Sequence, residues 1–209
     1  MDMLEGETQV RDYGLERLIM LSDGVFAIAL TLLAIELKPP PDWDGTVAGL
    51  LQGSLLGLIA FATSFGLIGM YWAYHRLTFR YYGRADPMVS LLNFVVLAFV
   101  VLIPFASRLL AERGPQSEAL YVYIGVVAAL GAALAAQWTW GAFLGGLTRG
   151  LALGYRIFLL CNLLFVMTAM CALAVIGARP GLWWTYLVMA AIFMALLVLR
   201  RRFVREAPA

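Results

Sequence analysis

The stretch Arg17-Leu-Ile-Met-Leu-Ser-Asp-Gly-Val-Phe-Ala-Ile-Ala-Leu-Thr-Leu-Leu-Ala-Ile-Glu-Leu37 decides the fold. A helix rises about 1.5 Å per residue, so as a helix this stretch spans about 30 Å, the hydrocarbon thickness of a bilayer. Polar residues gather near its start, at Arg17, Ser22 and Asp23. Ionisable groups are costly in lipid, so these side chains should face water or a protein partner. The stretch therefore predicts a membrane-spanning helix with a polar anchor near one end.

The composition of the whole chain agrees with a membrane protein. Of its 209 residues, 63% are hydrophobic and only 13% are charged, whereas soluble domains carry about 25% charged residues. The tails and loops between apolar segments are too short to bury a separate core. Cys161 and Cys171 lie ten residues apart in one predicted helix, about 15 Å of rise, which is too far for a disulfide.

The apolar segments predict an all-α integral membrane protein with a single six-helix transmembrane domain over residues 1–209. Proline, glycine and charged residues separate the segments, because they favour turns and polar connections. Pro87, for example, follows a polar connection and suits the first position of a helix. The six predicted helices are 16–37, 47–74, 87–110, 119–146, 154–177 and 182–203.

The distribution of arginine and lysine predicts the orientation. With the N-terminus in the cytoplasm, the inner segments hold eleven basic residues, namely Arg11, Arg17, Arg76, Arg80, Arg84, Arg149, Arg156, Arg200, Arg201, Arg202 and Arg205. The outer segments then hold four, namely Lys38, Arg108, Arg113 and Arg179. Basic residues favour the cytoplasmic side, so both termini are predicted to be cytoplasmic. The six-helix count agrees, because an even number of crossings returns the chain to the same side.

One face of the first helix carries an apolar stripe. Its residues follow helical spacing of i, i+3, i+4 and i+7, and are Ile28, Thr31, Leu32 and Ile35. The opposite face is apolar too, with Phe26, Leu30, Leu33 and Leu37. Hydrophobicity alone does not say which face meets lipid and which meets protein. Packing against another helix is the plain interpretation of the stripe.

The second helix is predicted to lie inside the bundle and to meet the polar start of the first. It is rich in glycine, alanine and serine, which let helices approach closely. Trp72 and His75 stand near its inner end, at the predicted depth of Ser22 and Asp23. An indole or imidazole donor there would satisfy the hydroxyl or the carboxylate. The alternative for His75 is a solvated interfacial residue, and for Trp72 a membrane-interface anchor.

These residues also carry a resemblance to a known family. The first helix resembles the first-helix signature of the transmembrane-protein-175 family of potassium channels. The resemblance consists of Arg17, then three residues, then Leu21-Ser22-Asp23, and the apolar run that follows. Leu21 departs from that signature, which has Phe at this place. Trp72, His75, Asn93 and the Pro104-Phe105 pair also resemble the family, so the likeness covers the first three predicted helices.

The resemblance implies a non-canonical potassium channel fold with the first helix lining the pore. Carried over by position, the pore-lining constriction falls on Ile28, Thr31, Leu32 and Ile35. The implied helix-orienting polar network is Arg17, Ser22, Asp23, Trp72 and His75. This chain holds a single six-helix repeat, so the resemblance also implies a homotetramer. The chain lacks a Thr-Val-Gly-Tyr-Gly carbonyl filter, and Glu36 would draw cations to the pore mouth.

The sequence offers no pattern for catalysis or for a cofactor. It has one histidine and two cysteines, which excludes the usual metal-ligand spacings. It has no glycine-rich phosphate loop and no serine–histidine arrangement with an orienting acid. We therefore expect no enzyme, no metal beyond permeating potassium ions, and no cofactor. Nucleic acid is also not an expected partner, because the basic residues line the predicted membrane face.

The sequence thus predicts a homotetrameric, potassium-permeable cation channel of the multi-pass type, in a bacterial inner membrane. Its partners are further copies of itself, potassium ions and the lipid bilayer. Two other hypotheses stay open. One is a secondary transporter or proton-coupled carrier that uses Asp23 as its coupling acid. The other is a non-conducting membrane scaffold.

Overall fold

The computed structural model describes residues 13–40, 43–114, 117–148 and 150–177. The described chain forms helices α1 (Tyr13–Ile35), α2 (Val47–Phe79), α3 (Pro87–Arg113), α4 (Ala119–Thr139) and α5 (Leu153–Gly177), with a π-helix η1 (Trp140–Leu144) directly after α4. No strand occurs among these residues, which confirms the all-helical class. The sixth predicted helix, 182–203, and both termini lie outside the described residues.

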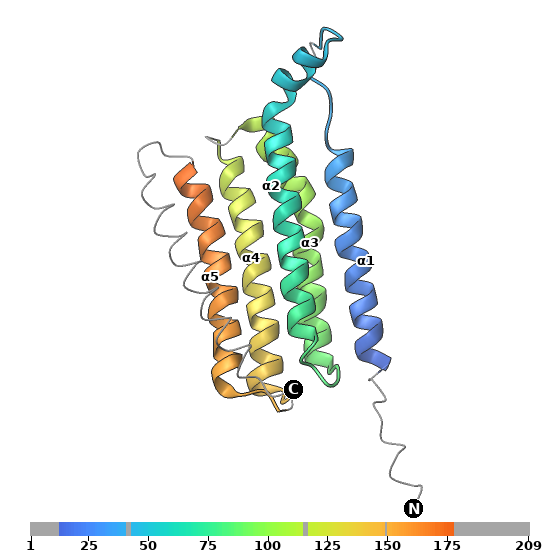
Figure 1. Ribbon diagram of the computed structural model, residues 1–209, viewed down its shortest axis with the longest axis vertical. Coiled ribbons are helices and arrows are strands. Elements are labelled where there is room, and N and C mark those ends of the chain that lie inside the picture. The colour runs from blue at the N-terminus through green and yellow to red at the C-terminus, as the bar shows by residue number, and fades with distance from the viewer. Residues whose placement is uncertain (1–12, 41–42, 115–116, 149, 178–209) are drawn as a thin grey trace, which may run out of the picture.

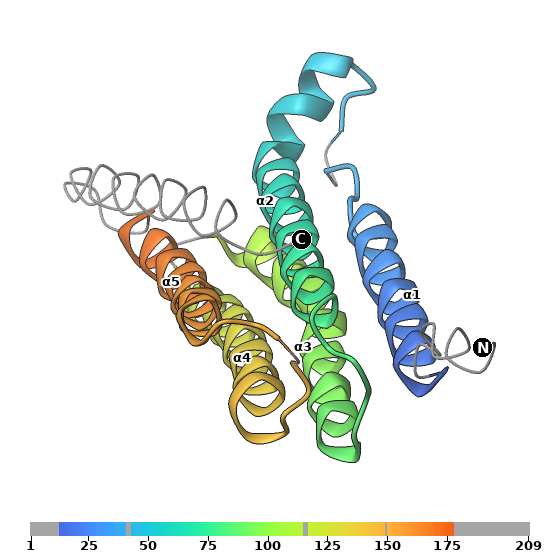
Figure 2. The same ribbon diagram turned by 60° about the horizontal axis from the view of Figure 1, so that its bottom comes forward.

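Four of the helices are long and apolar enough to cross a membrane, namely α1, α2, α3 and the continuous α4–η1 segment. Successive helices run in opposite directions and form an elongated bundle (Figure 1). Helix α1 packs on α2 and α3, while α4 packs on α3 and α5. Helices α1 and α5 therefore stand on opposite sides of the described bundle, as Figure 2 also shows. This order leaves one side of α1 without a neighbour among the described helices.

Local sequence explains where α2 and α3 begin. The Thr46 hydroxyl accepts a hydrogen bond from the Gly49 amide at 3.0 Å, and the Asp86 carboxylate accepts one from the Val89 amide at 2.6 Å. Both residues thus satisfy amides that the first helical turn leaves unpaired. Pro87 follows Asp86 as the first residue of α3. Helix α3 continues past Pro104 to Arg113 and ends at Gly114, whose φ is +82°.

The described helices depart from the predicted bounds, and the differences are largest for α2 and α4. Helix α2 extends to Phe79 rather than residue 74, and its 33 residues span about 50 Å. Its first turns lie beyond the ends of the neighbouring helices (Figure 1). The α-helix of α4 ends at Thr139, and the π-helix continues it to Leu144. A Cβ atom at Gly141 would lie 2.4 Å from the Tyr82 ring, so glycine permits the α2–α3 connection to approach η1 this closely.

Candidate pore-lining helix and its polar anchor

Helix α1 has one fully buried face and one free face. The buried face consists of Leu15, Leu18, Ser22, Phe26, Ala29 and Leu33. The residues of the predicted stripe lie on the other side: Ile28 is 57% exposed, Leu32 38% and Ile35 69%. Thr31 is exposed as well, and its hydroxyl donates to the Ile28 carbonyl at 2.8 Å. The stripe is therefore not packed inside the protomer.

A buried amide, Asn93 on α3, connects four helices at one point. Its Nδ2 donates to the Ser22 hydroxyl of α1 at 2.9 Å. Its Oδ1 lies 2.8 Å from His75 Nε2 of α2 and accepts from Gln137 Nε2 of α4 at 3.2 Å. An amide oxygen only accepts, so His75 carries its proton on Nε2 here. All four side chains have no exposed surface, so these bonds form without competition from water.

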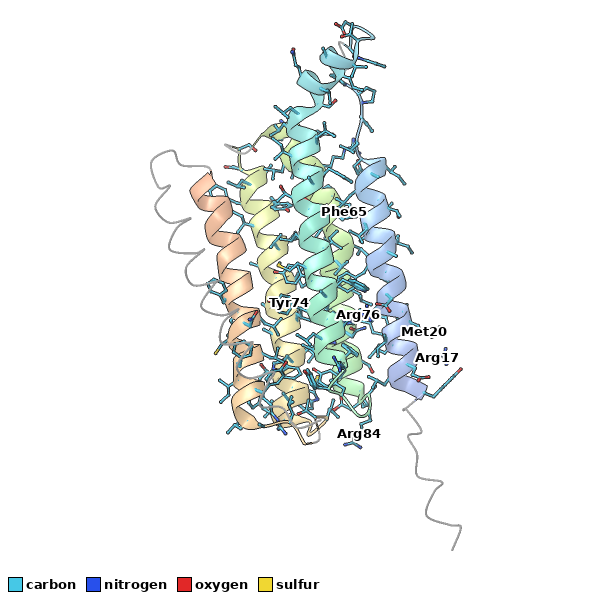
Figure 3. All side chains as sticks on the ribbon, viewed as in Figure 1. Arg17, Met20, Phe65, Tyr74, Arg76 and Arg84 are labelled. Carbon is cyan, nitrogen blue, oxygen red and sulfur yellow. The ribbon has the colours of Figure 1, made fainter. Side chains whose placement is uncertain are left out.

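Asp23 and Trp72 form a second link between α1 and α2. The indole Nε1 of Trp72 donates to Asp23 Oδ1 at 2.7 Å. The guanidinium of Arg76 lies 4.8 Å from the centre of the Trp72 ring, on the other side of this contact. Figure 3 labels Arg76 on α2. A carboxylate on an apolar helix thus has a donor, and a nearby cation adds to the favourable environment.

Arg17 lies apart from this cluster. It is exposed, and its guanidinium stacks over the ring of Tyr13 at 5.7 Å. Figure 3 shows Arg17 and Met20 on the side of α1 that faces away from the other helices. Of the five residues in the predicted network, the structure brings Ser22 and His75 together through Asn93. It joins Asp23 directly to Trp72, and it places Arg17 outside both links.

An ion pair joins the end of α1 near Glu36 to α3. Arg108 Nη1 lies 3.0 Å from Glu36 Oε2, and Arg108 Nε lies 2.8 Å from Glu112 Oε1. Sequence reasoning placed Glu36 at the pore mouth and counted Arg108 only as an outer basic residue. The i, i+4 spacing of Arg108 and Glu112 in the sequence indicates that these two side chains can pair on one helix. The pairing with Glu36 depends on the packing of α1 against α3.

Two further polar contacts stabilise the bundle, and sequence reasoning did not find them. The Ser64 hydroxyl on α2 lies 3.0 Å from both the Ser107 hydroxyl on α3 and the Tyr123 phenol on α4. Near the other end, the Tyr82 phenol donates to the Gln137 carbonyl at 3.0 Å. Burial, with a smaller effect of Asp86, raises the pKa of Tyr82, which keeps this phenol protonated as a donor. The sequence signal that could have identified these contacts is the presence of hydroxyl groups within apolar segments.

The fold and the site together define a multi-pass membrane protein in which one polar-anchored helix keeps an apolar face free. Comparison with known proteins shows what the chain is similar to. The profile described as "Endosomal/lysosomal potassium channel TMEM175" matches residues 17–104. A protein of Streptomyces collinus named as a potassium channel is 35% identical over 127 residues, covering 58% of this chain and 62% of that protein.

A protein of Chamaesiphon minutus, also named as a potassium channel, is 40% identical over 121 residues, covering 54% of this chain and 59% of that protein. The chain thus spans about 60% of the length of these relatives. A crystal structure from Chamaesiphon minutus, described as a lysosomal potassium-selective channel TMEM175 homologue, aligns with a TM-score of 0.63 and 26% identity. That alignment covers 93% of this chain and 98% of the other. Residues 17–104 are thus similar to the TMEM175 family, and the fold is similar to that of a TMEM175 homologue.

Proposed function

We propose that the chain forms a potassium-permeable cation channel as a homotetramer, with α1 of each copy lining a central pore. The observation that carries this proposal is the free apolar face of α1. Ile28, Leu32 and Ile35 are exposed while Phe26 and Leu33, on the opposite side, are at most 2% exposed. Because one side of α1 is packed against the neighbouring helices, the other side of α1 can face a pore.

The proposed pore uses a hydrophobic constriction instead of carbonyl groups. Ile28, Leu32 and Ile35 would narrow the pore and control its hydration. Thr31 adds a ring of hydroxyl oxygens, which keep acceptor capacity while their protons are donated to the Ile28 carbonyl. Glu36 would lie at the outer mouth and attract cations. Relatives named as potassium channels support this assignment of the conducted ion.

The polar anchor would set the position of the constriction. Asn93 holds Ser22 at 2.9 Å and Trp72 holds Asp23 at 2.7 Å, so α1 is fixed in rotation and in height against the rest of the protomer. Ile28 lies about 9 Å along the helix from Ser22. A rotation of α1 would therefore move the constriction out of the pore. In this proposal Ser22, Asp23, Trp72 and His75 are positioning residues, and Arg17 orients the start of α1 at the cytoplasmic surface.

The setting and the absence of catalysis are part of the proposal. The chain would act in a bacterial inner membrane, with no enzyme activity and with potassium ions, lipid and its own copies as partners. Among the described residues, no group of three or more histidine, cysteine, aspartate or glutamate side chains is placed to hold a metal ion. The permeating ions would therefore pass along the α1 face rather than bind at a resident metal centre.

Ion flux through purified protein in liposomes tests the proposal, with sodium replacing potassium in a parallel series. We expect fast flux that does not saturate and that favours potassium. Saturable flux that Asp23→Asn abolishes in folded protein would instead support a coupled transporter. Vesicles that contain folded protein and show no flux would overturn the channel proposal and favour a scaffold.

The same assay tests the constriction. Ile28→Asn places an amide where the proposed pore is apolar, so we expect hydration of the constriction and a higher potassium flux. Ile157→Asn is the matched control, because Ile157 is an exposed isoleucine on α5, at 46% exposure, on the other side of the bundle. An unchanged flux in folded Ile28→Asn protein, or an equal increase in both variants, would show that Ile28 does not face the pore.

A further inference from the structure

A single guanidinium group lies between two carboxylates at the outer end of the bundle. Arg108 contacts Glu36 at 3.0 Å and Glu112 at 2.8 Å, through different nitrogen atoms. The three side chains are partly open to solvent, with exposures of 41% for Arg108, 31% for Glu36 and 55% for Glu112. The cluster therefore carries two negative charges and one positive charge in a place that ions can reach.

The backbone places Glu36 next to the free face of α1. The Glu36 amide donates to the Leu32 carbonyl at 3.2 Å, so helical hydrogen bonding continues one residue beyond the helix end at Ile35. Residues four apart on a helix lie nearly above one another. Glu36 thus lies one turn beyond Leu32 towards the outer end, at the edge between the free face and the buried face.

We propose that Arg108 is a built-in counter-charge that sets the electrostatic potential at the outer mouth of the pore, and with it the rate of cation entry. This inference rests on the proposed channel function. Arg108 leaves the three side chains with a net charge of −1, and Lys38 and Arg113 add positive charge close enough to act on Glu112. Neutralising Arg108 makes each chain more negative by one charge. In a tetramer the difference is four negative charges around one opening. Negative charge at a narrow opening raises the local concentration of cations.

Single-channel conductance in planar bilayers tests the role of Arg108. The conductance is measured at about 10 mM potassium, where the Debye length is about 30 Å, and at about 1 M potassium, where it is about 3 Å. Arg108→Gln should raise the conductance at low salt at least about twofold, because Glu36 is no longer paired, and should leave it unchanged at high salt. Glu36→Gln should lower the low-salt conductance. The double variant, with both Arg108→Gln and Glu36→Gln, retains only the charge of Glu112 among the three side chains. Their net charge is then −1, as in the unmodified chain, so the double variant should conduct like the unmodified chain.

Two controls separate this effect from general changes in charge or folding. Arg108→Lys keeps the positive charge and should conduct like the natural chain at both salt concentrations. Glu118→Gln removes a carboxylate at the start of α4, which packs mainly on α3 and α5, and should lower the low-salt conductance less than Glu36→Gln does. If Arg108→Gln does not fold, the comparison of Glu36→Gln with the double variant carries the test.

The outcomes distinguish the inference from the function on which it rests. No current through the natural chain overturns the channel proposal, and this inference with it. A natural chain that conducts, combined with an Arg108→Gln conductance that stays the same at low salt, overturns the inference alone. An increase in Arg108→Gln that is equally large at 1 M potassium would also overturn it, because that increase is not electrostatic.

Discussion

At the residue scale, Asn93 is the side chain on which the position of α1 depends most. It is one of a few polar residues in an apolar helix, and it bonds to side chains from α1, α2 and α4 at once. Removing it leaves a hydroxyl, an imidazole and an amide buried without their shared partner. Because a buried polar group without a partner is destabilising, the four-helix junction should be sensitive to a single substitution.

Asn93→Ala should lower the free energy of unfolding by about 2 kcal/mol. This value reflects the cost of leaving buried polar groups without a hydrogen-bond partner, and it allows for the smaller hydrogen-bond energies found inside membrane proteins. Denaturant unfolding in detergent, followed by tryptophan fluorescence, measures this loss. Asn162→Ala is the matched control, because Asn162 is a buried asparagine on α5 whose amide oxygen accepts one described bond, from Tyr74. Equal losses in both variants would contradict a special role for Asn93.

At the element scale, Arg156 organises the connection between α4 and α5. Its guanidinium donates to the carbonyls of Ala142 at 2.7 Å, Thr148 at 3.0 Å and Leu151 at 2.9 Å. The carbonyls at the end of a helix have no partner in the helix, so they need outside donors. One side chain of α5 thus stabilises the π-helix and the loop that follows it.

Arg156→Lys should loosen this connection, because a lysine ammonium cannot match the fork of donors that reaches three carbonyls. We expect faster hydrogen exchange in residues 140–148 and a loss of about 1–2 kcal/mol in the free energy of unfolding. Arg80→Lys is the control, since Arg80 is an exposed arginine near the same end of the bundle. Unchanged exchange in Arg156→Lys would show that the loop does not depend on the guanidinium.

At the scale of the whole molecule, the free face of α1 has no neighbour among the other described helices. Lipid would satisfy the apolar side chains of Ile28 and Ile35, but a pore requires other copies of α1 opposite them. The described bundle places α1 on one side and α5 on the other (Figure 2). Copies arranged around an axis near α1 would bring four equivalent faces together, since closed rings of identical chains are the common form of oligomer.

Purified protein in mild detergent should therefore have four times the mass of one chain. Light scattering combined with size-exclusion chromatography, corrected for bound detergent, measures the mass of the protein part. Ile157→Asn should leave this mass unchanged, because Ile157 is on α5, away from the proposed axis. A monomer that conducts potassium in liposomes would contradict the tetrameric arrangement and place the conduction path inside a single bundle.

The amino-acid sequence was sufficient to predict the described helices and several of their ends. Backbone groups in lipid must be satisfied within a segment, so long apolar runs become helices whatever their packing. Pro87 after a polar connection marked the start of α3, because proline suits the first position of a helix. Polar groups in an apolar segment need polar partners. For this reason the sequence also predicted that the first helix, at Ser22 and Asp23, meets the second helix at Trp72 and His75. The π-helix after Thr139 had no such signal in the sequence.

Only the tertiary structure decided which face of α1 is free, which residue joins the anchor, and which cation pairs with Glu36. Both faces of α1 are apolar, and lipid is as apolar as a protein interior, so hydrophobic periodicity cannot separate packed from free residues. Asn93 and Gln137 lie far apart in the sequence, as do Glu36 and Arg108. Their contacts follow from the way α1, α3 and α4 pack, which is a property of the whole bundle rather than of any one segment.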